Sequence, residues 1–212
     1  MSVAIKNCGI KTAQALHECA RTGAGYVGFV HHLASPRHVP LEQLKKLAAK
    51  TPDHVKQVVV LVDPSLELLD EILTVIRPHF WQVHRVAAAD RVRAITTHTG
   101  IPVITAISVR DRNSLTNIDA LEGASDHLLF DAHHPHQEGG SGTVFDWSLM
   151  RLIRPSKPWF LAGGLNADNV ADAIAATHAP MVDVSSGIES TPGVKSLEKI
   201  AAFNAAVLHG SH

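Results

Sequence analysis

The side chains best suited to proton transfer come at the ends of apolar runs. Cys8 ends the run Val3–Cys8, and Asp131 ends the run Asp126–Asp131 (DHLLFD). A thiol becomes a base or nucleophile once nearby positive charge lowers its pKa, and a carboxyl partly removed from water acts as a general acid. The two residues together predict acid–base chemistry. The alternatives are a thiol that is only a small buried hydrophobe and a carboxylate that only accepts hydrogen bonds from loop amides.

Two glycine-containing segments predict a phosphate site. AGGL (Ala162–Leu165) and SSGIE (Ser185–Glu189) each follow an apolar run. Glycines let the backbone approach a ligand closely, and the N–H groups at a helix start favour an anion. Tight turns would explain either segment alone, but both together favour phosphate binding. The candidate ligands are Gly163, Gly164, Ser185, Ser186 and Gly187.

The elements that must position these residues alternate along the whole chain. Short apolar runs predict strands over Val3–Cys8, Gly25–Val30, Gln57–Asp63, Phe80–His84, Pro102–Ile107, Asp126–Asp131, Lys157–Ala162 and Met181–Ser185. Amphipathic stretches predict helices over about residues 12–21, 41–49, 88–98, 147–152, 167–176 and 197–207, and two more that begin near residues 65 and 113. We expect Asp63 and Asn166 to cap the helices that follow them.

Strands separated by helices of about a dozen residues form parallel βαβ units. Eight such units, with no linker or change in composition, predict an α/β fold in which residues 1–212 form a single (β/α)8 TIM barrel of eight parallel strands. A doubly wound open sheet is the alternative. Active sites of such barrels lie at the C-terminal ends of the strands, and the loops after strands seven and eight often bind phosphate. Both candidate groups of residues fall at these places.

Composition excludes several classes of protein. A formal net charge of −1 and a pI near 6.9 give no sign of a nucleic-acid or membrane partner. The N-terminal residues lack the features of a signal peptide, and the 2 cysteines, Cys8 and Cys19, suit a reducing compartment, so we expect a cytoplasmic protein. The 15 histidines, several clustered around His31 and His133, raise the question of a metal site. Because no metal-binding motif accompanies them, polar loop residues are the favoured interpretation.

Several segments together resemble the phosphoribosylanthranilate isomerase family of tryptophan biosynthesis, along nearly the whole chain. They read, in order, IKNCGI, GFV followed by SPRHV, WQVH, LLFDA, GGSGTVFDW, LAGGLNADNV and VDVSSGIESTPGVK. Single segments would be weak signals, but their order and spacing are highly specific. The resemblance implies an Amadori rearrangement, in which N-(5-phosphoribosyl)anthranilate becomes 1-(2-carboxyphenylamino)-1-deoxyribulose 5-phosphate.

The resemblance also assigns roles to residues. It implies that Cys8 is the general base and Asp131 the general acid, with Arg37 as the partner of the anthranilate carboxylate. It places His84 beside the substrate, whereas Asp183 would contact sugar hydroxyls or be a structural strand residue. The resemblance implies that the substrate is a small phosphorylated molecule. Because both chemical steps are proton transfers, it implies neither a metal nor an organic cofactor. The enzyme would be a monomer or a homodimer.

Some positions depart from the usual pattern of that family. Arg85 stands where glycine commonly follows the histidine, Thr105 where lysine is frequent, and Ser196 where aspartate is usual. The loop after Asp131 (AHHPHQEGG) and the pair His31-His32 also differ. These departures leave two alternatives open: a related phosphosugar isomerase or epimerase, with or without assistance from a metal, and a phosphosugar-binding barrel without activity.

Overall fold

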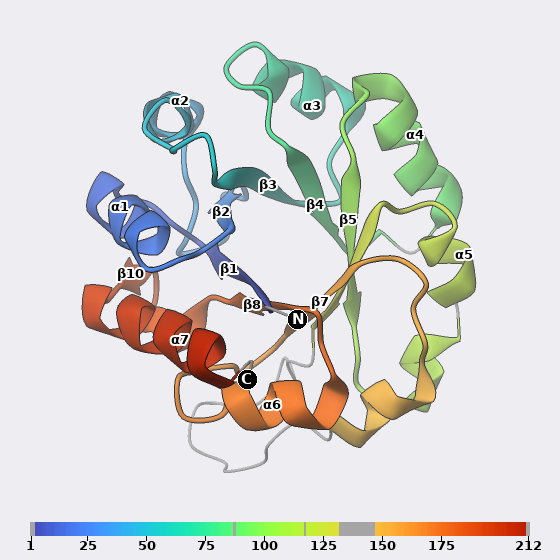
Figure 1. The fold of residues 1–212 in the computed structure, drawn as a ribbon. Coiled ribbons are helices and arrows are strands. Elements are labelled where there is room, and N and C mark those ends of the chain that lie inside the picture. Colours follow the sequence, from blue (N-terminus) through green and yellow to red (C-terminus); the bar gives the residue numbers. More distant parts are fainter. Residues whose placement is uncertain (1–2, 87, 117, 132–146, 211–212) are drawn as a thin grey trace.

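Eight parallel strands close into a barrel in the order of the chain (Figure 1). The computed structural model describes residues 3–86, 88–116, 118–131 and 147–210. The strands are β1 (Ala4–Cys8), β2 (Tyr26–Val30), β3 (Lys56–Val62), β4 (Phe80–His84), β5 (Val103–Ser108), β6 (His127–Asp131), β7 (Trp159–Ala162) and β8 (Met181–Val184). Parallel pairing of β1 with β8, which sets Lys6 opposite Asp183, closes the barrel. The predicted TIM barrel is confirmed.

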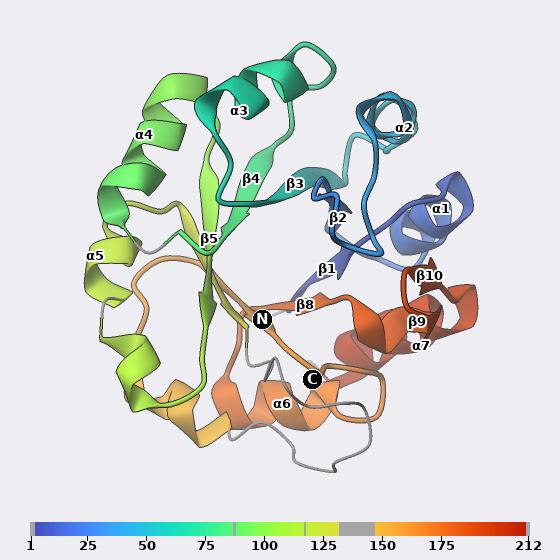
Figure 2. The same ribbon diagram turned by 180° about the vertical axis from the view of Figure 1, so that it is seen from behind.

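Helices surround the barrel on its outside (Figures 1 and 2). They are α1 (Ala13–Arg21), α2 (Leu41–Ala48), α3 (Leu66–Leu73), α4 (Ala89–Thr99), α5 (Ile118–Glu122), α6 (Val170–Thr177) and α7 (Leu197–Gly210), with short 3-10 turns η1 (Arg112–Leu115), η2 (Trp147–Leu152) and η3 (Ser186–Ile188). The sixth connection therefore carries a 3-10 turn over the expected residues, and the helix expected from residue 113 is split into η1 and α5.

The alternation of side chains along each strand divides the core into two parts. One part lies between the strands and the helices and includes Phe29, Trp81 and Phe203. The other fills the inside of the barrel and includes Tyr26 and Phe160. Strands buried on both faces explain why their sequences are almost continuously apolar. The polar exceptions inside the barrel are therefore candidates for function.

Two predicted helix caps are wrong. Ser65, and not Asp63, caps α3, because its hydroxyl accepts a hydrogen bond from the Leu68 N–H at 3.2 Å. Asp63 is exposed and has a φ of 41°. Before α6, Asn166 accepts hydrogen bonds from the N–H groups of Asp168 and Asn169, so it orders the turn that precedes the helix, and Asn169 is the residue at the helix start.

A small hairpin after β8 was not predicted from the sequence. It consists of β9 (Glu189–Thr191) and β10 (Val194–Lys195), paired antiparallel, and it lies between η3 and α7. Gly193 at its tip has a φ of 81°, and a Cβ there would come within 2.5 Å of the Pro36 carbonyl oxygen. The hairpin therefore packs tightly against the loop that follows β2.

The predicted histidine cluster and the question of a metal site depend on which residues the structure describes. His133, His134, His136 and the glycines of the same loop lie outside the described residues. Within the described ranges, no group of three or more His, Cys, Asp or Glu side chains is arranged to hold a metal ion. No helix in this part of the chain has both the length and the apolar character needed to cross a bilayer.

Candidate active site

Inside the barrel, Lys6, Cys8 and Asp183 form a buried polar group. Because side chains alternate along β1, Lys6 and Cys8 point to the same face of the strand. The Lys6 Nζ atom donates to the Asp183 Oδ1 atom across the β1–β8 seam at 2.7 Å. Lys6 is 0% exposed, Cys8 6% and Asp183 8%. A buried lysine is costly unless it is paired, so this ion pair accounts for its presence.

Room for this group comes from a glycine on the neighbouring strand. Gly28 of β2 lies opposite Cys8 in the register. A Cβ at Gly28 would come within 2.8 Å of the Cys8 Sγ atom and 3.2 Å of the Lys6 Nζ atom. Any larger residue at position 28 would therefore push the thiol or the ammonium out of place.

Burial raises the pKa of the Cys8 thiol above its ordinary value, although Lys6 and Lys195 oppose this change. Desolvation outweighs the two ammonium groups, because the interior of the barrel excludes water from the sulfur. Burial also disfavours the Lys6 ammonium, but Asp183 and Cys8 outweigh it and hold the pKa of Lys6 above its ordinary value. Lys6 therefore stays charged beside the thiol.

A pocket of about 680 Å³ opens over this group at the C-terminal ends of the strands. Its lining includes five of the predicted catalytic and substrate-binding residues, namely Cys8, Arg37, His84, Asp131 and Asp183. Asp131, half-buried at the end of β6, faces this pocket. The structure thus brings together side chains from β1, β4, β6, β8 and the loop after β2. Asp63 is not part of the lining.

His84 is held as a neutral imidazole. Burial lowers the pKa of His84 to about 4, and the nearby Lys6 ammonium contributes to this change. The amide Nε2 atom of Gln82 lies 2.9 Å from the His84 Nε2 atom. At neutral pH the ring therefore offers hydrogen bonds to a ligand without adding positive charge to the pocket.

A second, smaller pocket of about 250 Å³ adjoins the first. Four of the predicted phosphate ligands line it: Gly163, Gly164, Ser185 and Ser186. Gly163 and Gly164 have φ values of 95° and 66°, which only glycine adopts without strain. Arg37, Asp131, Asp183 and Ser185 line both pockets, so the two form one continuous site.

Gly187 has a different place from the other predicted phosphate ligands. It is absent from the lining of the small pocket, and a Cβ at this position would come within 1.9 Å of the Leu165 carbonyl oxygen. Glycine is therefore needed here because the loops after β7 and β8 touch at this point. Gly187 shapes the site by letting these two loops approach each other.

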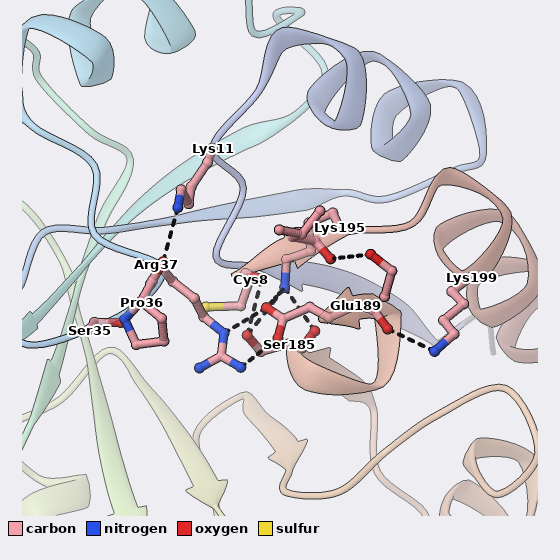
Figure 3. Close-up of polar contacts among 11 residues, drawn as sticks. Cys8, Lys11, Ser35, Pro36, Arg37, Ser185, Glu189, Lys195 and Lys199 are labelled. Carbon is pink, nitrogen blue, oxygen red and sulfur yellow. Dashed lines mark hydrogen bonds and ion pairs between the residues drawn. The ribbon is translucent and has the colours of Figure 1, made fainter. Parts of the chain in front are cut away.

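Arg37 reaches the site from the loop after β2 and is fixed by Glu189 of β9 (Figure 3). The Arg37 Nε and Nη2 atoms donate to the two carboxylate oxygens of Glu189, each at 2.7 Å. The Lys195 Nζ atom also donates to Glu189, at 2.9 Å, and to the Ser185 carbonyl oxygen, at 2.8 Å. These contacts join the loop after β2, the hairpin and the segment after β8.

Sequence reasoning missed Lys6, Glu189 and Lys195. A signal for Lys6 exists in the sequence, because a charged residue two positions before Cys8 in an apolar strand must share its face. Glu189 and Lys195 carry no such signal. Glu189 meets Arg37 across 152 positions of sequence, and the unpredicted hairpin brings Lys195 to the same carboxylate.

The positions that depart from the family pattern differ in their closeness to the site. Arg85 lines the large pocket and has a φ of 61°, which explains why glycine is common there and indicates local strain. His32 also lines this pocket. Thr105 lies away from it, where its hydroxyl bonds with that of Ser125 at 2.7 Å. Ser196 caps the start of α7 by accepting from the Lys199 N–H, a role that aspartate also fills.

The chain matches the family model described as N-(5'-phosphoribosyl)anthranilate (PRA) isomerase over residues 5–206. It is 43% identical to the isomerase of that name from Beijerinckia indica subsp. indica, over 96% of this chain and 93% of that protein. The crystal structure of the Thermotoga maritima phosphoribosyl anthranilate isomerase superposes with a TM-score of 0.89 and 30% identity, covering 97% of this chain and 98% of that one.

A phosphoribosyl anthranilate isomerase has also been solved in complex with reduced 1-(o-carboxyphenylamino)-1-deoxyribulose 5-phosphate. That structure gives a TM-score of 0.85 at 28% identity, over 97% of this chain and 98% of that chain. The likeness thus extends over nearly the whole chain. This chain belongs to the N-(5'-phosphoribosyl)anthranilate isomerase family.

Proposed function

We propose that this chain isomerises N-(5'-phosphoribosyl)anthranilate to 1-(2-carboxyphenylamino)-1-deoxyribulose 5-phosphate, a step of tryptophan biosynthesis. The observation that carries the proposal is the continuity of two pockets. The larger is lined by a thiol, a carboxyl and an arginine, and the smaller by two loops suited to phosphate. A substrate with a phosphate at one end and a carboxylate at the other fits this division. Family membership supports the same reaction.

The reaction begins with binding of both ends of the substrate. The loops after β7 and β8 hold the phosphate through Gly163, Gly164, Ser185 and Ser186, and Gly187 keeps these loops in contact. Arg37 binds the anthranilate carboxylate, since its planar guanidinium matches a carboxylate. These two contacts place the ribose between them, beside Cys8 and Asp131.

Asp131 then acts as the general acid. Its carboxyl donates a proton to the furanose ring oxygen, the bond from C1 to that oxygen breaks, and the ring opens to a Schiff base. Cys8 acts as the general base and takes the proton from C2, which gives an enolamine. Tautomerisation of the enolamine, with a proton added at C1, gives the ketoamine product. Side chains alone perform these proton transfers, so we propose a reaction without metal or organic cofactor.

Lys6 explains how a buried thiol serves as a base. The free thiol is largely protonated because burial raises its pKa. The Lys6 ammonium, fixed by Asp183, lies beside the sulfur and stabilises the thiolate when it forms. Asp183 also lies close enough to the pocket for contact with sugar hydroxyls, and the neutral ring of His84 offers a further hydrogen bond.

Conversion of N-(5'-phosphoribosyl)anthranilate by the purified chain, with a metal chelator present, tests this function. We expect turnover that the chelator leaves unchanged, and rescue of a tryptophan auxotroph that lacks the isomerase. Loss of turnover on chelation, restored by a stoichiometric metal, would favour the metal-assisted alternative. Binding of the reduced product analogue without turnover would favour a non-catalytic barrel.

The remaining assignments concern the chain as a whole. We propose that residues 1–212 form one domain, that the enzyme works in the cytoplasm, and that it is a monomer or a homodimer. The barrel closure between β1 and β8 supports the first assignment, because it joins the two ends of the chain. Sedimentation equilibrium distinguishes the two oligomeric states.

A further inference from the structure

Arg37 presents two edges, and Glu189 occupies only one of them. A guanidinium carries five N–H donors in a planar fork. Glu189 takes the edge formed by the Nε and Nη2 atoms, with both hydrogen bonds at 2.7 Å (Figure 3). Among the described residues, the Arg37 Nη1 atom has no hydrogen-bonded partner. The edge formed by Nη1 and Nη2 is therefore left for a second carboxylate, and Arg37 lines both pockets.

Arg37, Glu189 and Lys195 form a cluster whose net charge favours binding of an anion, although Glu189 contributes a carboxylate. Glu189 accepts from Arg37 and also from the Lys195 ammonium at 2.9 Å. Two cations and one anion leave a net charge of +1. Exposure is 24% for the Arg37 side chain, 4% for Glu189 and 3% for Lys195, so water screens the two inner charges little. Arg37 thus keeps its attraction for an anion while one of its edges is fixed.

Further hydrogen bonds to backbone carbonyl oxygens fix the segment that carries Glu189 and Lys195. The Lys199 Nζ atom donates to the Glu189 carbonyl oxygen at 2.7 Å, and Lys195 bonds the Ser185 carbonyl oxygen. Burial raises the pKa of Glu189, but the hydrogen bonds from Arg37 and Lys195 outweigh it, so the pKa lies below its ordinary value. Glu189 is therefore a fixed anion that does not titrate at neutral pH.

Two glycines bring Arg37 into this arrangement. A Cβ at Gly9 would come within 2.8 Å of the Arg37 Cδ atom, so the arginine stem lies directly on the backbone after β1. At the tip of the hairpin, Gly193 packs against the Pro36 carbonyl oxygen. The aliphatic stem of Arg37 and its Nε–Nη2 edge are both held in place. The Nη1–Nη2 edge is therefore left to bind a ligand.

We propose that Glu189 is a positioning residue for substrate binding: it fixes one edge of the Arg37 guanidinium so that the other edge meets the carboxylate of the aromatic substrate, while Lys195 keeps the cluster positively charged. This inference rests on the proposed function, because it assumes a substrate with a carboxylate. It assigns to the β9–β10 hairpin a part in recognising the substrate carboxylate, through Arg37.

Glu189→Gln separates positioning from charge. The substitution preserves shape but removes one hydrogen bond to Arg37 and raises the net charge of the cluster to +2. If Glu189 only reduced the local positive charge, the variant would bind both phosphate and carboxylate ligands more tightly. If it only stabilised the hairpin, the variant would have a lower melting temperature and unchanged ligand binding. Positioning predicts weaker binding of carboxylate-bearing ligands alone.

The experiment measures two ligands on the native enzyme and on Glu189→Gln. Reduced 1-(o-carboxyphenylamino)-1-deoxyribulose 5-phosphate carries both anionic groups, and inorganic phosphate carries one. We expect the dissociation constant of the analogue, and the KM of the substrate, to rise about tenfold, as loss of a charge-assisted hydrogen bond implies. Inhibition by phosphate should stay within about twofold, and kcat should change little. Glu198→Gln, an exposed glutamate of α7, is the matched control and should change nothing.

The outcomes that decide the inference are the following. An unchanged analogue affinity and KM in folded Glu189→Gln would overturn it, as would equal weakening of both ligands. In an Arg37→Ala background, Glu189→Gln should have no further effect on the analogue, because the proposed action passes through Arg37. If Glu189→Gln does not fold, Lys195→Met makes the cluster neutral, and an unchanged analogue affinity there overturns the inference. A native protein that binds the analogue without turnover contradicts the proposed function alone.

Discussion

The two ends of the barrel interior are built from opposite kinds of side chain. At the N-terminal ends of the strands, aromatic rings fill the space: Tyr26 meets Phe160 edge to face at 5.3 Å between ring centroids, and Phe80 meets His127 at 4.8 Å. Toward the C-terminal ends, the same interior holds Cys8, the last residue of β1, and Asp183, which pairs with the ammonium group of Lys6. Packing of aromatic rings at one end stabilises the fold, whereas the paired charges at the other end belong to the candidate active site.

The two ends differ in the free energy that each side chain gains or loses when it is buried. The rings at the N-terminal end gain free energy by leaving water, and edge-to-face contacts add to it. The charges at the C-terminal end lose hydration on burial, and each depends on its partner to offset that loss. We therefore expect substitutions at the two ends to change different measured quantities, and the following predictions test that division.

Substitution of Asp131 should have the largest effect on activity. Asp131→Asn removes the proton that the proposed mechanism gives to the ring oxygen, so we expect kcat to fall about a thousandfold, within the range for loss of a general acid. Asp126 comes just before the other end of β6, where its carboxylate accepts from the Val103 N–H. Asp126→Asn is the matched control and should leave kcat within about threefold, because the carboxyl there serves only structure. Equal losses of activity in both variants would contradict the division.

The Lys6–Asp183 pair should affect both the activity and the free energy of unfolding, and a double substitution separates the two effects. Lys6→Met leaves a buried carboxylate without its partner, so we expect the free energy of unfolding to fall by about 3–5 kcal/mol. Lys6→Met with Asp183→Asn removes both charges and should recover much of that stability in urea unfolding. Turnover should stay low, because the Lys6 ammonium that lies beside the sulfur no longer stabilises the Cys8 thiolate. A stable double variant with native kcat would show that the pair serves the fold alone.

The aromatic end should show the opposite behaviour. Phe160→Ala removes a fully buried ring inside the barrel, so we expect a loss of about 3–5 kcal/mol in the free energy of unfolding. Activity of the folded fraction should stay within a few-fold of native, since no polar contact of the site involves Phe160. A large change in kcat at temperatures well below the midpoint would show that the two ends are coupled.

Much of this architecture was predictable because its signals are local. The alternation of strands and helices appears in short stretches, so most strand bounds agree within one or two residues. The phosphate loops follow from the same order. The Lys6–Asp183 and Arg37–Glu189 pairs were not predicted, because each joins residues more than 150 positions apart and depends on barrel closure. The direction of the Cys8 pKa was not predictable either, since it depends on burial, which cannot be read from a residue's type.

The smallest predicted effect concerns pH. Burial lowers the pKa of His84 to about 4 in the folded chain, below the ordinary value of about 6.5 that applies when it is unfolded. The neutral ring therefore favours the folded state above about pH 6.5, and this contribution is lost as the pH falls toward 4. It amounts to at most about 3 kcal/mol. Urea unfolding at pH 7.5 and 4.5 should show a smaller difference for His84→Gln than for the native chain.

The most direct test of the whole account compares Cys8→Ser with the native chain in one assay of N-(5'-phosphoribosyl)anthranilate turnover. Binding of the reduced product analogue verifies that the site is intact in each of the two proteins. We expect native binding of the analogue by both proteins and a loss of kcat of about a thousandfold in the variant, because a hydroxyl is a far weaker base than a thiolate. Full turnover by Cys8→Ser would contradict the account.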